Sequence, residues 1–235
     1  MTGYIHSVYN GGMVDGLGIR SVVFLSGCPL RCLYCHNPDS WVKTSGEQRT
    51  VTDVINEVKK YTTFHKASGG GVTFTGGEPF TQAKFLTQLL KSCKENDIHT
   101  ALDTSGYTSA ENAKQALQYT DLLMLDIKSI NPAVYKKLTG VKIDKTLDML
   151  DISRDMNVPT WIRYVLVPGL TDDARDLANL AEYLRPYSNI KKIDLLPFHK
   201  VGEYKWHERE IPYTLADTPT PTVEMMQRAK EILGL

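Results

Sequence analysis

The feature that most constrains the fold is a regular alternation of apolar, β-rich runs with helical patterns along the 235 residues. The expected strands cover residues 21–25, 72–75, 100–103, 122–127, 161–167 and 193–197. The expected helices cover residues 53–64, 82–95, 110–118, 132–138, 145–156, 174–184 and 223–233. Several of the strands are almost continuously hydrophobic, as in parallel sheets that are buried on both faces. Six strand–helix units in series predict an α/β fold, a partial (β/α)6 barrel whose parallel sheet is open on one side.

No repeat, low-complexity tract or linker interrupts this pattern, so we expect residues 1–235 to form a single domain. Lys+Arg and Asp+Glu both number 27, and this zero net charge argues against a partner that is a nucleic acid. No apolar run approaches the roughly 18 residues that a membrane-spanning helix needs, so no membrane association is expected. Only four cysteines occur, and we expect a soluble protein in the reducing cytoplasm.

Three of the four cysteines lie within eight residues, as Cys28, Cys32 and Cys35 with the spacing C-x3-C-x2-C. Cysteine thiolates hold iron–sulfur clusters, and three of them bind only three irons of a [4Fe-4S] cube. The fourth iron is then open to a small molecule, just as a catalytic metal keeps one position free. The spacing therefore favours a cluster that performs chemistry. Cys93 lies in an amphipathic helical pattern and is expected to be a small core residue.

Three other interpretations of the cysteine loop compete with a cluster. Residues 32–36 match C-x-x-C-H, the attachment signal for c-type haem, but that chemistry belongs to secreted proteins and residues 1–4 do not resemble a signal peptide. A structural zinc site could add His36 or Cys93, but such sites usually have a distant second ligand pair, which is missing here. A disulfide would leave an odd thiol in the same loop and needs an oxidising compartment. The iron–sulfur cluster remains the favoured interpretation.

Polar groups recur at the carboxyl ends of the expected strands, where chemistry gathers in folds of this kind. They are the cysteine loop, Thr75–Pro79, Asp103–Gly106, Asp126–Lys128, Arg163 and His199. Each has an ordinary explanation when taken alone, since a glycine pair can be a tight turn and an Asp–Lys pair can be a surface ion pair. Arg163 lies in a mostly apolar run and needs an anionic partner or a wet face. The convergence of six segments on one rim predicts an active site.

An iron with a free position needs a chelating ligand, such as the amine and carboxylate of an amino acid. Gly76 and Gly77 have no Cβ, so a ligand can approach their backbone closely. Glu78 could orient the amine of this ligand. Asp126 and Lys128 would project the same way because side chains in a strand alternate with a period of two. Asp126 could then bind ribose hydroxyls or a cation, and Lys128 could pair with a carboxylate.

The cysteine loop, with the aromatic Tyr34 before Cys35, resembles the radical S-adenosylmethionine enzymes. Further segments resemble one family of these, the glycyl-radical activases that act on pyruvate formate-lyase; they are residues 14–20, 32–37, 67–73, 98–104, 124–128, 161–165 and 195–199. The resemblance extends from about residue 5 to residue 206, with the motifs in the family's order. Leu17 is a departure, because the family usually has proline there. This loosens one turn near the expected substrate edge.

The resemblance implies a [4Fe-4S] cluster on Cys28, Cys32 and Cys35, with S-adenosylmethionine chelating the open iron. Together with Gly76 and Glu78, the expected cofactor-binding residues are Tyr34, Cys35, His36, Gly77, Asp126, Ile127, Lys128, Arg163 and His199. A site for a monovalent cation is implied at Asp103, Thr104, Met124 and Asp126. No side chain is expected to be catalytic beyond the cluster and the cofactor.

The implied activity is reductive cleavage of S-adenosylmethionine to a 5′-deoxyadenosyl radical, which abstracts an α-hydrogen from a glycine of pyruvate formate-lyase. A flavodoxin- or ferredoxin-type protein would donate the electron, and the chain is expected to be a monomer. One cysteine remains outside the loop, so we expect no ferredoxin-like insert, which would need four more thiolates. The alternatives are an activase of another glycyl-radical enzyme, a radical S-adenosylmethionine enzyme for a small molecule, and a structural zinc or electron-transfer module.

Overall fold

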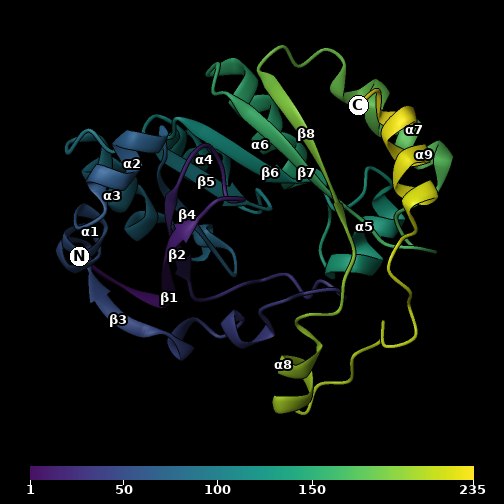
Figure 1. The fold of residues 1–235 in the computed structure, drawn as a ribbon, viewed down its shortest axis with the longest axis horizontal. Helices are drawn as coiled ribbons and strands as arrows, with labels where there is room; N and C mark the ends of the chain where they lie inside the picture. The colour runs from purple at the N-terminus through teal and green to yellow at the C-terminus, as the bar shows by residue number, and fades with distance from the viewer.

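The computed structural model describes residues 1–235 and contains one eight-stranded sheet that does not close into a barrel (Figure 1). The strands follow the order β3-β1-β2-β4-β5-β6-β7-β8. Their bounds are β1 Thr2–Gly12, β2 Arg20–Leu25, β3 Glu47–Thr50, β4 Gly71–Gly76, β5 Thr100–Thr104, β6 Leu122–Asp126, β7 Thr160–Leu166 and β8 Ile190–Pro197. β2 and β4 to β8 are mutually parallel. These are the six predicted strands, and the predicted open α/β barrel is confirmed.

Two further strands, β1 and β3, extend the sheet beyond the prediction. β1 pairs antiparallel with both β2 and β3. It is only partly buried along its length, and β3 is a short polar segment on the edge. Neither strand has the apolar run by which a strand buried on both faces is recognised. Since β3 and β8 form the two edges of the sheet, the barrel is open between them.

Most of the helices lie along the outside of the curved sheet, whereas α8 lies apart from the strands, at the bottom of the view in Figure 1. Their bounds are α1 Val51–Lys59, α2 Thr62–Ser68, α3 Ala83–Lys94, α4 Ala110–Leu117, α5 Pro132–Thr139, α6 Asp144–Asp155, α7 Ala174–Leu184, α8 Glu203–Glu208 and α9 Val223–Leu233. Three short 3-10 helices are η1 Pro38–Ser40, η2 Lys43–Ser45 and η3 Pro79–Gln82. The helix expected over 53–64 is divided into α1 and α2, and α8 was not expected. None of the helices combines the length and apolar composition needed to cross a bilayer.

Local capping chemistry explains where several helices begin. The Thr50 side chain accepts a hydrogen bond from the Asp53 amide, and the Asp53 carboxylate accepts one from the Thr50 amide, which forms a capping box at α1. Asn131 caps α5 through Oδ1, and Pro132 occupies the first turn, where its missing N–H costs nothing. Asn131 and Pro132 thereby fix the start of α5, the helix whose carboxyl end contacts the cysteine loop.

Three hydrophobic clusters fill the interior, and the two larger ones position the site. The larger cluster contains 35 buried residues and fills the space between the sheet and its outer helices. A smaller cluster contains Tyr34, Leu138, Val167, Phe198, Trp206, Tyr213 and Leu215. It joins the cysteine loop to the end of α5, the end of β8 and the segment around α8. This second cluster positions the loop, because burial of aromatic side chains is the largest local source of packing energy.

Candidate functional site

A cavity of about 700 Å³ lies at the inner side of the sheet and is lined by residues from every parallel strand or the segment after it. The residues of the predicted rim that line this cavity are Cys28, Cys32, Tyr34, Cys35, His36, Thr75, Gly76, Gly77, Asp103, Thr104, Ser105, Asp126, Lys128, Arg163 and His199. The structure therefore brings together all six segments that the sequence singled out.

Main-chain hydrogen bonds hold the cysteine loop on both sides of the cavity mouth. On one side, the Gly27 amide donates to the Ser40 carbonyl at 2.7 Å. On the other, the amides of Arg31 and Leu33 donate to carbonyls at the end of α5, those of Thr139 (2.8 Å) and Leu138 (3.0 Å). These bonds satisfy carbonyls that a helix end otherwise leaves unpaired. The loop is thus fixed before any ligand binds.

The three thiols of the loop are half-buried, unpaired by any disulfide and close enough to influence one another. Burial raises the pKa of each thiol, and the pKa of Cys32 rises to about 12. At Cys28 the neighbouring sulfurs raise the pKa further. Metal ligation requires thiolates, so loading this site releases protons. No three His, Cys, Asp or Glu side chains surround a single metal position. Three thiols on one short loop are the donor set that a [4Fe-4S] cube with one open iron requires.

The last cysteine is held by aromatic side chains. The Trp206 indole N–H donates to the Cys35 carbonyl at 2.8 Å, and Trp41 packs edge-on against Trp206 with ring centroids 5.2 Å apart. The rings of His36 and His199 stack with centroids 4.3 Å apart, and His36 Nε2 lies 3.2 Å from the His199 carbonyl oxygen. Burial lowers the pKa of His36, so its ring is neutral at pH 7 and can donate to that carbonyl. The end of β8 is thereby coupled to the cysteine loop.

Asp126 and Lys128 form an ion pair at the end of β6. Lys128 Nζ donates to Asp126 Oδ2 at 2.6 Å and lies 5.7 Å from the centroid of the Tyr34 ring. Burial is the largest single influence and would lower the pKa of Lys128, but Asp126, Tyr34 and Cys32 together outweigh it and raise the pKa well above its ordinary value. Lys128 is therefore a permanent cation in the cavity wall. Ile127, between the two, is fully buried and points away from the cavity.

A second ion pair, between Asp103 and Arg163, crosses the cavity wall. Arg163 Nη1 donates to Asp103 Oδ2 at 3.0 Å, and the Thr75 hydroxyl donates to the same oxygen at 2.8 Å. The Asp103 charge raises the pKa of Arg163 despite its burial. Asp103 Oδ1 and Arg163 Nε are buried without any hydrogen-bond partner. Such atoms cost free energy unless they bind something, so they mark a position for a polar ligand.

The side chains of Glu78 and Met124 lie outside the cavity lining. The Glu78 carboxylate is buried and accepts hydrogen bonds from the Thr104 hydroxyl (2.7 Å), the Ser105 amide (2.9 Å) and the Phe80 amide (3.1 Å). Burial raises the pKa of Glu78, and these hydrogen bonds oppose the rise. Glu78 therefore stabilises the turn after β5 through hydrogen bonds and does not line the cavity. Met124 is buried and packs near Trp161.

The predicted glycine pair is required by close packing of the backbone. A Cβ on Gly77 would lie 2.4 Å from the Gly27 carbonyl oxygen and 3.0 Å from Cys28 Cβ. A Cβ on Gly76 would lie 2.2 Å from the Leu25 carbonyl oxygen, and its φ of 130° also favours glycine. Any larger residue at position 77 would displace the first cysteine.

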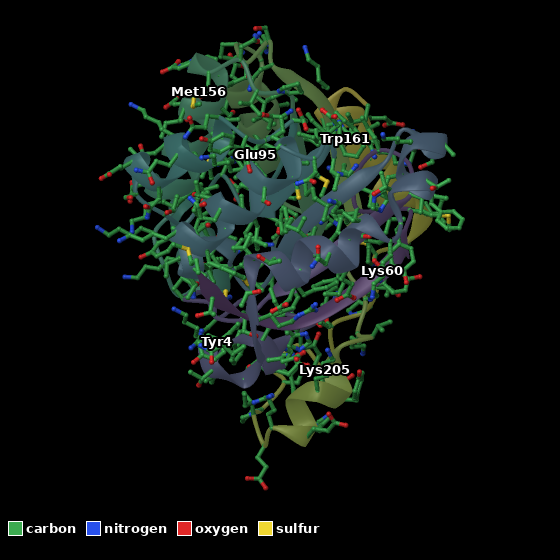
Figure 2. All side chains as sticks on the ribbon, turned by 90° about the vertical axis from the view of Figure 1, so that its left-hand side faces the viewer. Tyr4, Lys60, Glu95, Met156, Trp161 and Lys205 are labelled. Carbon is green, nitrogen blue, oxygen red and sulfur yellow. The ribbon has the colours of Figure 1, made fainter.

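A group of residues at the opposite mouth of the cavity has no role predicted from the sequence. They are Met13, Val14, Asp15, Gly16, Trp161, Lys192 and Asp194. Lys192 Nζ lies 2.8 Å from Asp194 Oδ1 and 4.7 Å from the centroid of the Trp161 ring. Trp161 lies toward the end of the molecule opposite Lys205 (Figure 2). Lys192, Asp194 and Leu196 alternate along β8, and this period of two was the available signal.

Buried Arg20 holds the segment that forms this second mouth. Its Nε donates to the Thr73 hydroxyl at 2.6 Å, and its Nη1 donates to the Leu17 carbonyl at 3.0 Å. The Thr73 hydroxyl donates in turn to the Asp15 carbonyl at 2.6 Å. Burial lowers the pKa of Arg20 to about 10, so it remains charged at pH 7. A cation that binds carbonyl oxygens is well suited to fix a loop without regular structure.

Comparison with known proteins agrees with this geometry. The model of the radical SAM superfamily matches residues 22–181. The pyruvate formate-lyase-activating enzyme of Listeria monocytogenes is 44% identical over 98% of this chain and 96% of its own length. The pyruvate formate-lyase 1-activating enzyme of Escherichia coli K12 is 43% identical over 98% and 95% of the two chains.

Solved structures show the same fold. A domain of a pyruvate-formate lyase-activating enzyme from Bacteroides vulgatus has a TM-score of 0.60 and 29% identity, over 70% of this chain and 93% of that one. A radical SAM methyltransferase from Sphaerobacter thermophilus has a TM-score of 0.66 and 17% identity, over 99% and 74%, a likeness of fold alone. The chain belongs to the radical SAM superfamily and, within it, to the family of pyruvate formate-lyase-activating enzymes.

Proposed function

We propose that this chain activates pyruvate formate-lyase by generating a glycyl radical on it. The observation that carries the proposal is that three thiols from one loop share a cavity with two ion pairs on the rim. The family implies a [4Fe-4S] cluster and S-adenosylmethionine. When bound, these groups supply an electron and a 5′-deoxyadenosyl radical, which removes an α-hydrogen from a glycine of the partner.

Cys28, Cys32 and Cys35 are the proposed ligands of the cluster. Their support is the donor set, since three free thiols line one cavity and no fourth cysteine reaches it. Cys93 is fully buried in α3, away from this wall. Three ligands leave one iron for S-adenosylmethionine. The chain's own task is to hold the thiols in place and keep the site closed to water by the aromatic side chains behind Cys35.

The proposed cofactor-binding residues divide by what their side chains offer. Lys128 offers a fixed positive charge for a carboxylate, and Asp126 offers an oxygen for hydroxyl groups. Gly76 and Gly77 offer exposed backbone, and Arg163 offers the unpaired Nε. Tyr34, Cys35, His36 and His199 complete the wall. Glu78 and Ile127 contribute through the turns that they fix, because their side chains do not line the cavity.

We also propose a monovalent cation among Asp103, Thr104, Met124 and Asp126. Its support is the buried, unpartnered Asp103 Oδ1. Asp103 is paired in register with Met124 on the neighbouring strand, which brings the two backbones side by side. Addition of potassium to protein dialysed free of alkali metals is expected to tighten S-adenosylmethionine binding. Asp103→Asn is expected to remove this effect.

Three features support the remaining parts of the proposal. The sheet does not close between β3 and β8, and we propose that a peptide loop of the partner reaches the cavity from this side. The single continuous sheet supports one domain without an insert, and we propose that this domain acts as a monomer. Unpaired thiols are stable in a reducing compartment, which supports a cytoplasmic location. The proposed electron donor is a protein of the flavodoxin or ferredoxin type.

Anaerobic reconstitution tests the proposal directly. The iron-loaded chain is mixed with S-adenosylmethionine, a reductant and pyruvate formate-lyase, and the glycyl radical is sought by electron paramagnetic resonance. We expect a radical signal on the partner and one 5′-deoxyadenosine formed for each radical. Release of 5′-deoxyadenosine with no radical on the partner, but with turnover of a small molecule, would assign the chain to a different radical SAM reaction.

A further inference from the structure

The cysteine loop has two faces with different surroundings. Cys28, Leu30 and Cys32 line the cavity, whereas the intervening Pro29 and Arg31 are exposed and do not line it. Under the proposed function the cavity face is taken by S-adenosylmethionine and the partner's glycine loop. An electron must therefore enter from the outward face. Pro29 and Arg31 are the exposed residues that directly adjoin Cys28 and Cys32 on this outward face.

The outward face is continuous with the end of α5. The Arg31 amide donates to the Thr139 carbonyl at 2.8 Å, and a Cβ on Gly140 would lie 4.0 Å from Arg31 Cβ. Gly140 takes a left-handed conformation with φ of 80° and ends the helix. Lys136 and Lys137 lie in the last turn of α5, and Lys142 follows it by three residues. Backbone contact thus places these lysines beside Arg31.

We call four cations the basic surface, namely Arg31, Lys136, Lys137 and Lys142. All four are exposed, and no carboxylate oxygen lies within 4.0 Å of their charged nitrogens. The whole chain has zero net charge, so this is a local excess. Arg31 Nη1 also donates to the carbonyls of Cys28 and Leu30, both at 2.7 Å. The positive field therefore begins at the cysteine loop itself.

We propose that the basic surface docks a small acidic electron-carrier protein, an inference that rests on the proposed function. The reduced carrier loses one electron and the cluster gains it; no covalent bond forms or breaks in this step. Charge complementarity selects an acidic protein and accelerates its encounter. Because the surface faces away from the cavity, carrier and pyruvate formate-lyase occupy different faces.

The test replaces the lysines and leaves Arg31 in place, because Arg31 also holds the cysteine loop. An acidic flavodoxin in its hydroquinone form is the probe, and Lys136→Gln, Lys137→Gln and Lys142→Gln are combined in one iron-loaded variant. Stopped-flow absorbance measures the rate of cluster reduction, and calorimetry measures the dissociation constant. We expect the second-order rate to fall about tenfold at low salt, and the difference to shrink as salt rises.

A matched control carries Lys60→Gln, Lys66→Gln and Lys114→Gln. These lysines are exposed, without ion pairs, and lie on α2, on α4 and just after α1. That side of the sheet faces the viewer in Figure 2, where Lys60 is labelled, whereas α5 lies on the other side in Figure 1. The control variant loses the same charge and is expected to bind flavodoxin like the unmodified chain.

Dithionite separates the failure of this inference from that of the proposed function. Reduction by dithionite is expected to be equal in both variants, because a small reductant needs no docking surface. Equal flavodoxin rates and affinities in the two variants would overturn the inference, as would absent flavodoxin binding to the unmodified chain. Loss of affinity for pyruvate formate-lyase instead would reassign the surface to that partner. Absence of dithionite-driven 5′-deoxyadenosine formation would refute the proposed function itself.

Discussion

Lys128 Nζ lies 2.6 Å from Asp126 Oδ2, with the fully buried Ile127 between the two residues in the chain. The buried residue fixes the backbone, and the polar pair faces the cavity. We expect Lys128→Ala to weaken S-adenosylmethionine binding at least tenfold, which corresponds to about 1.4 kcal/mol. The free energy of unfolding is expected to fall by about 1 kcal/mol or less, because the pair is partly hydrated.

Anaerobic calorimetry and thermal unfolding measure these two quantities on the same iron-loaded sample. Lys192→Ala is the control, since Lys192 forms a similar pair with Asp194 at the opposite mouth of the same cavity. It is expected to leave the affinity nearly unchanged. An unaltered affinity with a lower melting temperature in Lys128→Ala would show that the ion pair only stabilises the rim.

Cys32→Ala is expected to abolish cluster binding and leave the fold intact. Cys32 is half-buried in a loop held by main-chain hydrogen bonds that alanine keeps. Iron and sulfide analysis, with the visible absorption of the reconstituted protein, reports the cluster, and circular dichroism reports the fold. Cys93→Ala should show the reverse, with normal iron content and a loss of about 1 kcal/mol from removing a buried side chain. Full activity in Cys32→Ala would contradict the assigned ligand set.

Glu78→Ala is expected to lower the free energy of unfolding by about 3 kcal/mol, because it leaves several buried donors of the turn after β5 unsatisfied. Glu78→Gln keeps one acceptor oxygen and is expected to cost less. Denaturation of the iron-free protein measures both. If Glu78→Ala lost only cofactor affinity and no stability, the side chain would contact the cofactor directly.

Gly77→Ala is expected to displace Cys28 and lower the iron content after reconstitution. The added Cβ would lie 2.4 Å from the Gly27 carbonyl oxygen, so the backbone on one side has to move. Gly69→Ala is the control, since Gly69 has a φ of 68° but no atom within 4 Å of the added carbon. That variant should lose about 1 kcal/mol through backbone strain and keep its iron. Equal iron content in both would show that the loop tolerates displacement.

Acidification is expected to destabilise the fold through His65. This side chain is buried, and its Nε2 lies 3.1 Å from the Ser21 hydroxyl. Burial, and then the charge of Arg20, lowers the pKa of His65 below its ordinary 6.5. Below that pH the unfolded chain binds a proton that the native state does not, so the free energy of unfolding falls as pH falls.

Urea denaturation at several pH values between about 5 and 7 measures this slope, since the unfolded histidine titrates there. His65→Gln is expected to show a shallower decline than the unmodified chain. Identical slopes in the two proteins would exclude His65 as the cause.

The parallel part of the sheet was predictable because burial on both faces selects continuous apolar runs. The expected strand over 72–75 is observed as Gly71–Gly76, and the one over 100–103 as Thr100–Thr104. β1 escaped prediction because one of its faces is exposed, and β3 because edge strands tolerate polar residues. Local pattern alone could not reveal strands that depend on neighbours far along the chain.

The functional site likewise combines features that could be predicted from the sequence with features that could not. Strand ends indicated which segments reach the rim, and the period of two placed Asp126 and Lys128 together. The inward turn of Glu78 could not be predicted, because it depends on hydrogen bonds to Thr104 and Ser105 in another segment. The contact of Trp206 with Cys35 joins residues 171 positions apart and left no local signal. The burial of Arg20 left no local signal either, because its hydrogen-bond acceptors include a carbonyl oxygen 52 residues away in the chain.

The cysteine loop lies near the start of the chain, yet its closing contacts come from near the end. Trp206, Tyr213 and Leu215 complete the cluster that buries Tyr34. During synthesis the ribosome must finish about nine-tenths of the chain before these residues exist, so iron delivery to a growing chain would meet an unfinished pocket. Under the proposed function, metal insertion would therefore follow translation, and a product that ends before α8 would lack the side chains that complete the burial of Tyr34.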